Sequence, residues 1–306
     1  MSITIHQIIE KASNHPRIMA VAAAEDADIL AAVKNAMRRK IIRPVLIGDP
    51  DKIAVLAREA GLKLKNVEIV TSPSPEASVD IGMRMVADKK AHVIMKGLVN
   101  SAVYLRAALK KEYGVRGSGL LSHVALFFPK FFHKPFVVTD AGLNLFPTLE
   151  EKTVILRNTI AVLHKLGVEK PKVALLAHNE VPSEKVPASL DAQRIKQMYL
   201  EGRFPDCVID GPLALDLAIS REVCIHKGVK SEVGGDPDIL LCPDILSGNI
   251  LYKALAFMVK ALCAAVIVGA DVPMVMTSRA ESAKSKLLSI ALACVLCLPI
   301  DKKPEN

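Results

Sequence analysis

The chain of 306 residues contains no tryptophan, and aromatic residues make up only 4% of it. A nucleic-acid surface built on stacked aromatic side chains is therefore not expected, and no ribonucleoprotein motif or long basic tail occurs. The sequence also lacks a G-x-G-x-x-G dinucleotide fingerprint, a P-loop, a nucleophile elbow and an H-E-x-x-H zinc motif. These absences exclude the common motif-based nucleotide, esterase and zinc sites.

Long hydrophobic runs are missing as well. The longest uncharged apolar run, Leu287–Ile300, is too short to span a bilayer, and the N-terminal segment has no apolar core of the kind found in secretory signals. The six cysteines do not resemble a disulfide framework. Cys294 and Cys297 have redox-motif spacing, but their apolar surroundings favour packing on a buried helix. The sequence predicts a cytoplasmic protein with no membrane partner.

The composition indicates a globular protein with an anionic partner. Hydrophobic residues make up 51% of the chain and charged residues 24%, which is enough for a sizeable core in two domains. Lysine and arginine number 40 against 32 acidic residues, a net charge of +8. Such an excess suits nucleic acid, a membrane surface or a phosphorylated small molecule.

Short β-branched runs alternate with longer helical patterns. Nearly continuous apolar runs of this kind are typical of strands that are covered on both faces. Repeated βα units predict an α/β protein with a mainly parallel sheet. We expect strands at Ile18–Ala22, Pro44–Ile47, Asn66–Ile69, His92–Met95, His123–Phe128, Phe136–Thr139, Lys172–Leu176, Ile239–Cys242, Ala265–Val268 and Val272–Met276, with helices such as Asp26–Arg39, Pro75–Lys89 and Leu149–Leu166.

Two boundaries divide the chain into domains. The turn around Asp140–Gly142 follows a strand and ends the first part, and the segment after Pro273 begins a strand and a final helix that return to it. We therefore expect a discontinuous first domain, residues 1–142 plus 273–306, and a second domain, residues 143–272.

Polar residues that follow strands are the candidate site residues, because ligands of open α/β sheets bind at the carboxyl ends of strands. Thr277-Ser278-Arg279-Ala280-Glu281 follows a strand and starts a helix, and its arginine suits a phosphoryl group. The same residues also fit a capping box, with Ser278 as the N-cap and Glu281 at N3. Further candidates are Lys96, Asn100, Arg106, His123, Asp140 and Asn144.

An acidic group brackets one of the strands. Asp236 and Asp238 precede Ile239–Cys242, and Asp244 follows it. Oxygen ligands suit magnesium, although solvated turns around a strand explain the same pattern more simply. We therefore predict no metal in the site.

Seven segments, taken together, resemble the phosphate acetyl/butyryltransferase family, and most closely its butyryltransferases. They cover nearly the whole chain, and the last three in sequence order are highly specific to the family. The segments are PVLIG (44–48), MKGLVNS (95–101), SHVALF (122–127), TDAGLN (139–144), DGPLALD (210–216), DPDILLCPDILSGNILYK (236–253) and TSRAES (277–282).

The resemblance implies two α/β/α domains flanking a substrate cleft, an architecture like that of isocitrate/isopropylmalate dehydrogenases. It implies transfer of an acyl group from acyl-CoA to phosphate, with butyryl-CoA expected and acetyl-CoA the alternative. Coenzyme A is then a substrate and not a cofactor, and homo-oligomers built on a dimer through the second domain are expected.

The resemblance also assigns roles to individual residues. Arg279 would bind phosphate, Ser278 would hydrogen-bond the developing oxyanion, and Arg106 would hold phosphate or the CoA pyrophosphate. Phosphate acetyltransferases carry an aspartate six positions after the arginine as the proposed thiol base. Here that position is Ser285, which leaves Glu281 as the nearest carboxylate.

Two rival functions come from other classes. An NAD- and magnesium-dependent 2-hydroxy acid dehydrogenase on the same fold would use the acidic group at 236–244. A noncatalytic CoA- or phosphate-binding protein would not need the Ser278-Arg279 pair, whose presence argues against it.

Overall fold

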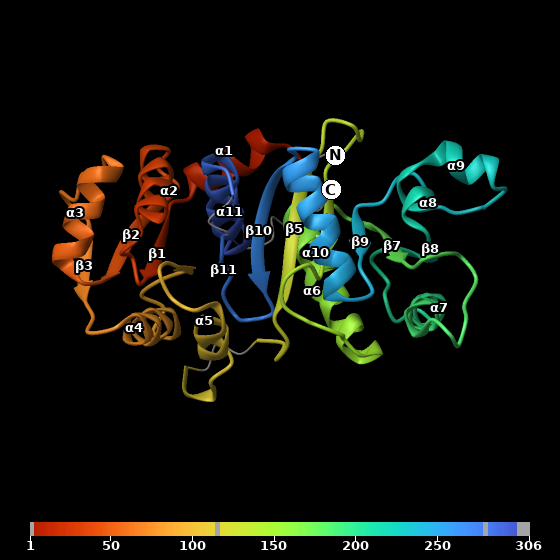
Figure 1. The fold of residues 1–306 in the computed structure, drawn as a ribbon, viewed down its shortest axis with the longest axis horizontal. Coiled ribbons are helices and arrows are strands. Elements are labelled where there is room, and N and C mark those ends of the chain that lie inside the picture. Colours follow the sequence, from red (N-terminus) through yellow and green to blue (C-terminus); the bar gives the residue numbers. More distant parts are fainter. Residues whose placement is uncertain (1–2, 114–116, 278–280, 299–306) are drawn as a thin grey trace, which may run out of the picture. The chain divides into compact units, whose positions relative to one another are not determined.

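The computed structural model describes residues 3–113, 117–277 and 281–298 (Figure 1). The chain forms two compact units. The N-terminal unit comprises Thr4–Leu121 and Cys263–Pro299, and the central unit is built on Ser122–Leu262. Within the described residues, no helix combines the length and the apolar character needed to cross a membrane.

The N-terminal unit contains a sheet in the strand order β3-β2-β1-β4-β11-β10. Its first five strands run parallel, and β10 pairs antiparallel with β11. The strands are β1 (Arg17–Ala22), β2 (Ile42–Gly48), β3 (Glu68–Thr71), β4 (Val93–Lys96), β10 (Leu262–Val268) and β11 (Met274–Val275). Residues Met19–Ala22 and Val93–Met95 have no exposed surface, as expected for central strands that are covered on both faces.

Helices of this unit begin at well-formed caps. Thr4 and Gln7 form a capping box, and Asp26, Asp49, Ser74 and Asn100 each accept a hydrogen bond from a backbone N–H of the first turn. The helices are α1 (Ile5–Asn14), α2 (Ala27–Arg38), α3 (Pro50–Ala60), α4 (Pro75–Ala87), α5 (Ser101–Ala108), the short η1 (Lys111–Tyr113) and α11 (Ala283–Leu296).

The central unit contains the strand order β5-β6-β9-β7-β8. β5 and β6 are antiparallel, and the other neighbours are parallel. The strands are β5 (Ser122–Phe128), β6 (Phe136–Thr139), β7 (Lys172–Leu176), β8 (Val208–Leu213) and β9 (Ile239–Leu241). The helices are α6 (Leu149–Lys165), α7 (Pro187–Leu200), α8 (Leu215–Ile219), α9 (Arg221–His226), α10 (Ile245–Lys253) and the π-helical turn η2 (Ala254–Met258).

The expectation of a mainly parallel α/β fold is confirmed, and each predicted strand overlaps an observed one. One strand, β8, was not predicted from the sequence. It contains Asp210, Gly211 and Pro212, residue types that are disfavoured within strands. Hydrogen bonding to β7 holds β8 in a strand conformation that its own residues do not favour.

The units change at residues 121/122 and 262/263, whereas the sequence placed the domain boundaries at 142 and 272. Strand pairing explains the difference. β6 hydrogen-bonds to β9 in the central unit, so the chain from Ser122 to Thr139 belongs with that unit. β10 pairs with β11, which ties residues from Cys263 onward to the N-terminal unit.

Candidate functional site

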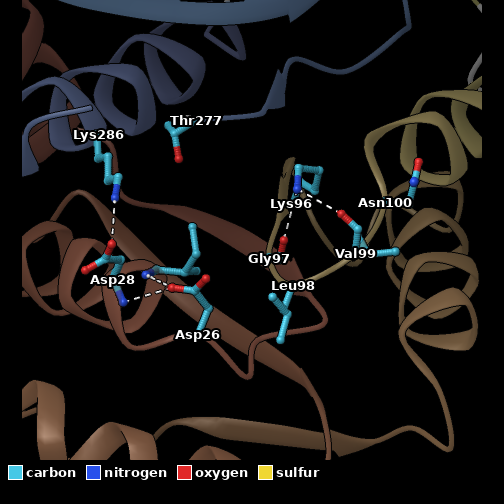
Figure 2. Close-up of a pocket in the computed structure, with 10 residues that line it drawn as sticks. Asp26, Asp28, Lys96, Gly97, Leu98, Val99, Asn100, Thr277 and Lys286 are labelled. Atoms are coloured by element: carbon cyan, nitrogen blue, oxygen red, sulfur yellow. Dashed lines mark hydrogen bonds and ion pairs between the residues drawn. The ribbon is translucent and has the colours of Figure 1, made fainter. Parts of the chain in front are cut away.

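The carboxyl ends of three adjacent parallel strands, β1, β4 and β11, meet at one edge of the N-terminal unit's sheet. Ala22 of β1 lies opposite Lys96 of β4, and Met95 lies opposite Val275 of β11. The loops that follow these strands surround a cavity of about 290 Å³ (Figure 2). It is lined by Asp26, Asp28, Ile29, Lys96, Gly97, Leu98, Val99, Asn100, Thr277 and Lys286.

The wall after β1 is the first turn of α2. The Asp26 carboxylate caps this helix, because its Oδ1 accepts hydrogen bonds from the backbone N–H groups of Asp28 at 2.9 Å and Ile29 at 3.0 Å. Asp28 is exposed on the same turn. Of the two carboxylates on this wall, that of Asp26 therefore caps the helix.

The wall after β4 is a tightly held loop. The backbone N–H groups of Gly97 and Leu98 donate to the carbonyl oxygens of Ala22 and Ala23 at 2.8 and 2.7 Å. A Cβ atom at position 97 would overlap the Ala23 carbonyl oxygen, so this close approach of two backbones requires glycine.

Two predicted site residues, Lys96 and Asn100, lie on this loop. The Lys96 ammonium donates to the carbonyl oxygens of Val99 at 2.9 Å and Gly97 at 3.2 Å. The Asn100 side chain caps α5 by accepting from the backbone N–H of Ala102 at 2.8 Å. The structure thus brings both residues to the cavity wall, where each also has a structural contact.

The third wall contains Thr277, from the candidate segment that follows β11, and Lys286, which was not predicted from the sequence. The Thr277 hydroxyl oxygen is buried and has no hydrogen-bond partner among the described residues. Lys286, on α11, is buried, and its Nζ lies 3.5 Å from Oδ2 of Asp28. One sequence signal could have identified Lys286, since it is the only charged residue in the otherwise uncharged stretch Ser285–Leu296.

The candidate catalytic residues Ser278 and Arg279 lie outside the described residues. Glu281 is described, and its predicted place in a capping box is wrong. The N-cap of α11 is Ser282, whose hydroxyl accepts from the backbone N–H of Ser285 at 3.1 Å. Glu281 therefore precedes the helix instead of occupying its N3 position. The prediction failed because the segment TSRAES contains two serines, Ser278 and Ser282, and either could be the N-cap of the helix; the structure uses the second.

Ser285, at the position of the expected aspartate, is buried. Its hydroxyl oxygen accepts from the backbone N–H of Cys263 at 3.4 Å and lies 3.1 Å from the Ser282 hydroxyl. Here this position links the first turn of α11 to β10.

Three predicted site residues, His123, Asp140 and Asn144, form one cluster in the central unit. Oδ1 of Asp140 accepts from the backbone N–H groups of Gly142 at 2.8 Å and Leu143 at 2.9 Å. Its Oδ2 accepts from the backbone N–H of His123 at 3.0 Å and from the side-chain amide of Asn144 at 2.7 Å. The carboxylate thus organises the loop that follows β6.

The His123 ring is buried beside the Tyr252 ring, with a centroid separation of 5.7 Å. Burial lowers the pKa of His123, although the nearby Asp140 carboxylate acts in the opposite direction. Its Nδ1 atom has no partner among the described residues. The remaining candidate, Arg106, is exposed on α5, and its Nε donates to the carbonyl oxygen of Ala102 at 3.2 Å.

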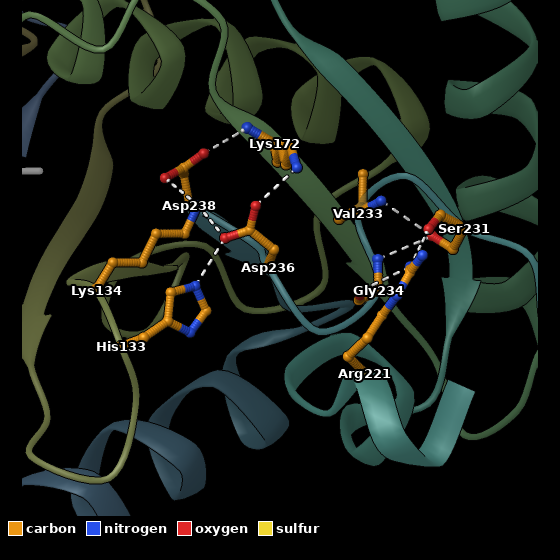
Figure 3. Close-up of polar contacts among 9 residues, drawn as sticks. All are labelled: His133, Lys134, Lys172, Arg221, Ser231, Val233, Gly234, Asp236 and Asp238. Carbon is orange, nitrogen blue, oxygen red and sulfur yellow. Dashed lines mark hydrogen bonds and ion pairs between the residues drawn. The ribbon is translucent and has the colours of Figure 1, made fainter. Parts of the chain in front are cut away.

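Asp236 and Asp238 of the acidic group at 236–244 pair with basic side chains (Figure 3). Asp236 pairs with Lys134 at 2.8 Å, Lys172 at 2.7 Å and His133 at 2.9 Å, and these contacts hold the pKa of its carboxyl well below its usual range against the opposing effect of burial. Asp238 also pairs with Lys134 at 2.8 Å, and Asp244 caps α10. No cluster of three or more metal-ligating side chains occurs in the part of the chain that the structure describes.

Comparisons with known proteins show the family of this chain. The sequence matches the family described as "Phosphate acetyl/butaryl transferase" over residues 3–80 and 75–294. It is 40% identical to the phosphate butyryltransferase of Clostridium acetobutylicum over 96% of this chain and 98% of that protein. It is 35% identical to the phosphate acetyltransferase of Thermotoga maritima over 95% of this chain and 99% of that protein.

Solved structures extend the likeness. A branched-chain phosphotransacylase from Enterococcus faecalis V583 superposes with a TM-score of 0.81 at 30% identity, covering 92% of this chain and 99% of the other. A 4-hydroxythreonine-4-phosphate dehydrogenase from Klebsiella pneumoniae shares the fold alone, with a TM-score of 0.56 at 11% identity over 92% and 98% of the two chains. The expected fold, of the type found in isocitrate dehydrogenases, is thereby confirmed, without implying common function. The chain belongs to the phosphate acetyl/butaryl transferase family and is a phosphate acyltransferase.

Proposed function

We propose that this phosphate acyltransferase converts butyryl-CoA and inorganic phosphate into butyryl phosphate and CoA in the cytoplasm. The observation that carries the choice of butyryl is the 40% identity, over almost the full length, to a protein named phosphate butyryltransferase. Acetyl-CoA is the alternative substrate, because a protein named phosphate acetyltransferase is 35% identical over a similar length. Six free cysteines fit a reducing compartment.

The reaction proceeds by direct transfer in a ternary complex. A phosphate oxygen attacks the thioester carbonyl carbon, the carbon–sulfur bond breaks, and CoA leaves as a thiolate that takes up a proton. Arg279 binds phosphate, and Ser278 hydrogen-bonds the carbonyl oxygen as it gains negative charge. Glu281 is the candidate for handling the thiol proton.

The described cavity supports this assignment. Lys96 and Asn100 lie on its wall beside Thr277, the residue immediately before Ser278. Lys286 also lines it and supplies a further cation, which suits the binding of an anionic substrate. In the sequence, Ser278 and Arg279 come directly after Thr277, which lines this cavity at the carboxyl ends of the strands.

The cysteines are poor candidates for a covalent acyl-enzyme, which needs a reactive thiolate. Burial raises the pKa of Cys207 to about 11 and that of Cys242 to about 12, and it also raises the pKa values of Cys224 and Cys294. Cys297 donates its thiol hydrogen to the carbonyl oxygens of His92 and Ala293. These environments favour a mechanism without a cysteine nucleophile.

Phosphate-dependent release of free CoA tests the proposed function. We expect butyryl-CoA to give a higher kcat/KM than acetyl-CoA, by roughly 10-fold or more, because each buried methylene contributes about 1–3 kcal/mol of discrimination. Varying both substrates should give intersecting initial-velocity lines. A higher kcat/KM for acetyl-CoA would contradict the acyl assignment, and parallel lines with an acylated cysteine peptide would contradict direct transfer.

The proposed partner of the protein is a second copy of itself, which docks through α10 and η2 of the central unit. Leu246 and Ile250 lie one helical turn apart and are exposed, and Met258 at the end of η2 is 82% exposed. Phe257 and Val259 continue this apolar patch. Exposed apolar side chains concentrated on neighbouring turns are typical of an interface.

A charge on this patch should weaken the dimer. We expect sedimentation equilibrium to show a dimer for the wild type and mainly monomer for Ile250→Lys at the same concentration. Lys253→Glu, on the same helix, is the control for a change of charge alone. A wild-type monomer at high concentration, or an Ile250→Lys dimer of unchanged affinity, would rule out this interface.

A further inference from the structure

Lys286 is a charged residue in a largely apolar stretch of α11. It belongs to the part of α11 from Ser285 to Leu296 in which every residue is buried, and its own side chain is only 6% exposed. α11 packs against α1 and α2. A buried ammonium group carries a large desolvation cost, and an anion in the cavity that Lys286 lines would offset part of that cost.

The ion pair between Lys286 and Asp28 is weak. Its N–O distance is 3.5 Å, and the Asp28 side chain is 66% exposed. Ion pairs with a solvated partner at such a distance contribute little to stability. The pair is better understood as a resting arrangement that an anion of higher charge can replace.

Thr277 provides an independent observation at the same place. Its hydroxyl oxygen is buried in the cavity wall, and no residue that the structure describes is a hydrogen-bond partner for it. Buried hydroxyl groups are rarely left unsatisfied. Figure 2 shows the Thr277 and Lys286 side chains entering the cavity from the same side, above the turn that carries Asp28. A ligand oxygen between them would satisfy the hydroxyl and pair with the ammonium group.

The cavity has room for a small anion. At about 290 Å³ it accommodates a phosphate ion with some water. Free phosphate and coenzyme A both carry the phosphate chemistry that an ammonium group and a hydroxyl group recognise. Separate KM values for phosphate and for acyl-CoA distinguish these two sources.

We propose that Lys286 and Thr277 bind the inorganic phosphate that this enzyme consumes, and that Asp28 is the counter-ion that phosphate displaces from Lys286. The inference rests on the proposed function and adds specific residues to its substrate site. No bond is made or broken at these residues. Lys286 offsets one of the two negative charges of the phosphate dianion, the Thr277 hydroxyl donates to a phosphate oxygen, and the departure of Asp28 removes a nearby negative charge.

Steady-state kinetics of Lys286→Met test the proposal, because methionine keeps an unbranched side chain of similar length in the core. We expect the KM for phosphate to rise about 10- to 100-fold, which corresponds to the loss of a hydrogen bond to a charged group, with the KM for acyl-CoA within about 2-fold of wild type. Thr277→Val should raise the phosphate KM by roughly 2- to 10-fold, as for a neutral hydrogen bond.

Asp28→Asn tests the counter-ion role, and its expected effect on the phosphate KM is opposite in direction to that of Lys286→Met. We expect it to lower the phosphate KM, because phosphate no longer competes with a carboxylate for Lys286. Asp51→Asn is the matched control. Asp51 occupies the same position of the first turn of α3, where its backbone N–H donates to the N-cap Asp49 at 3.0 Å, and it does not line the cavity. It should leave both KM values unchanged.

The outcomes separate this inference from the proposed function. Turnover by the wild type tests the function, whereas the phosphate KM of the variants tests the inference. An unchanged phosphate KM in a folded Lys286→Met would overturn the inference, as would a rise in the acyl-CoA KM alone. If the wild type has no activity, calorimetric titration with inorganic phosphate still compares it with Lys286→Met. Should that variant not fold, Thr277→Val and Asp28→Asn decide, and unchanged phosphate KM values in both would reject the inference.

Discussion

Replacement of Asp140 by alanine is expected to lower the free energy of unfolding by about 3–5 kcal/mol, because the buried carboxylate satisfies several donors at once. Three backbone N–H groups, from His123, Gly142 and Leu143, and the amide of Asn144 donate to it. Alanine leaves these donors without their acceptor, and the N–H of His123 is buried while the other three donors are half-buried. Urea unfolding followed by circular dichroism measures the effect.

Asp244→Ala is the control for the loss of one carboxylate in the same unit. Asp244 caps α10 by accepting from the backbone N–H and hydroxyl of Ser247, so its loss should cost about 1 kcal/mol. Equal destabilisation by the two variants would contradict the organising role of Asp140. An Asp140→Ala protein of normal stability whose turnover is lost would instead assign the carboxylate to substrate contact.

The fold could be predicted largely from the sequence because most strands are continuous apolar runs between amphipathic helices. Val93–Lys96 and Phe136–Thr139 follow this pattern closely. The order of the strands and the boundaries of the units were harder to predict from the sequence, because they depend on pairings such as that of β6 with β9. Local sequence does not contain the register of such long-range pairs.

The candidate site was predicted in part for a similar reason. Placing polar residues after strands identified Lys96 and Asn100, which lie on the cavity wall. The same reasoning did not select Asp28 or Lys286, because the first is a typical acidic residue of a first helical turn and the second stands inside an apolar helix pattern. Their proximity arises only from the packing of α11 against α2.

The remaining catalytic prediction concerns Arg279, which we expect to be the residue whose loss reduces turnover most. Arg279→Ala should lower kcat/KM about 30- to 1000-fold, equivalent to roughly 2–4 kcal/mol of transition-state stabilisation lost with a charge-assisted phosphate contact. Because α11 is capped by Ser282, the substitution precedes the buried helix. The melting temperature is therefore expected to remain near that of the wild type.

Arg39→Ala, at an exposed residue that ends α2, provides the control for removal of one positive charge. It should retain the kcat/KM of the wild type, since Arg39 does not line the cavity. Phosphate saturation distinguishes the two proposed cationic contacts further. Lys286→Met acts mainly on the phosphate KM, whereas Arg279→Ala must also lower kcat if the guanidinium stabilises charge in the transition state. Near wild-type kcat/KM in Arg279→Ala would remove the arginine from the mechanism and leave Lys286 and Lys96 as the cations that line the described cavity.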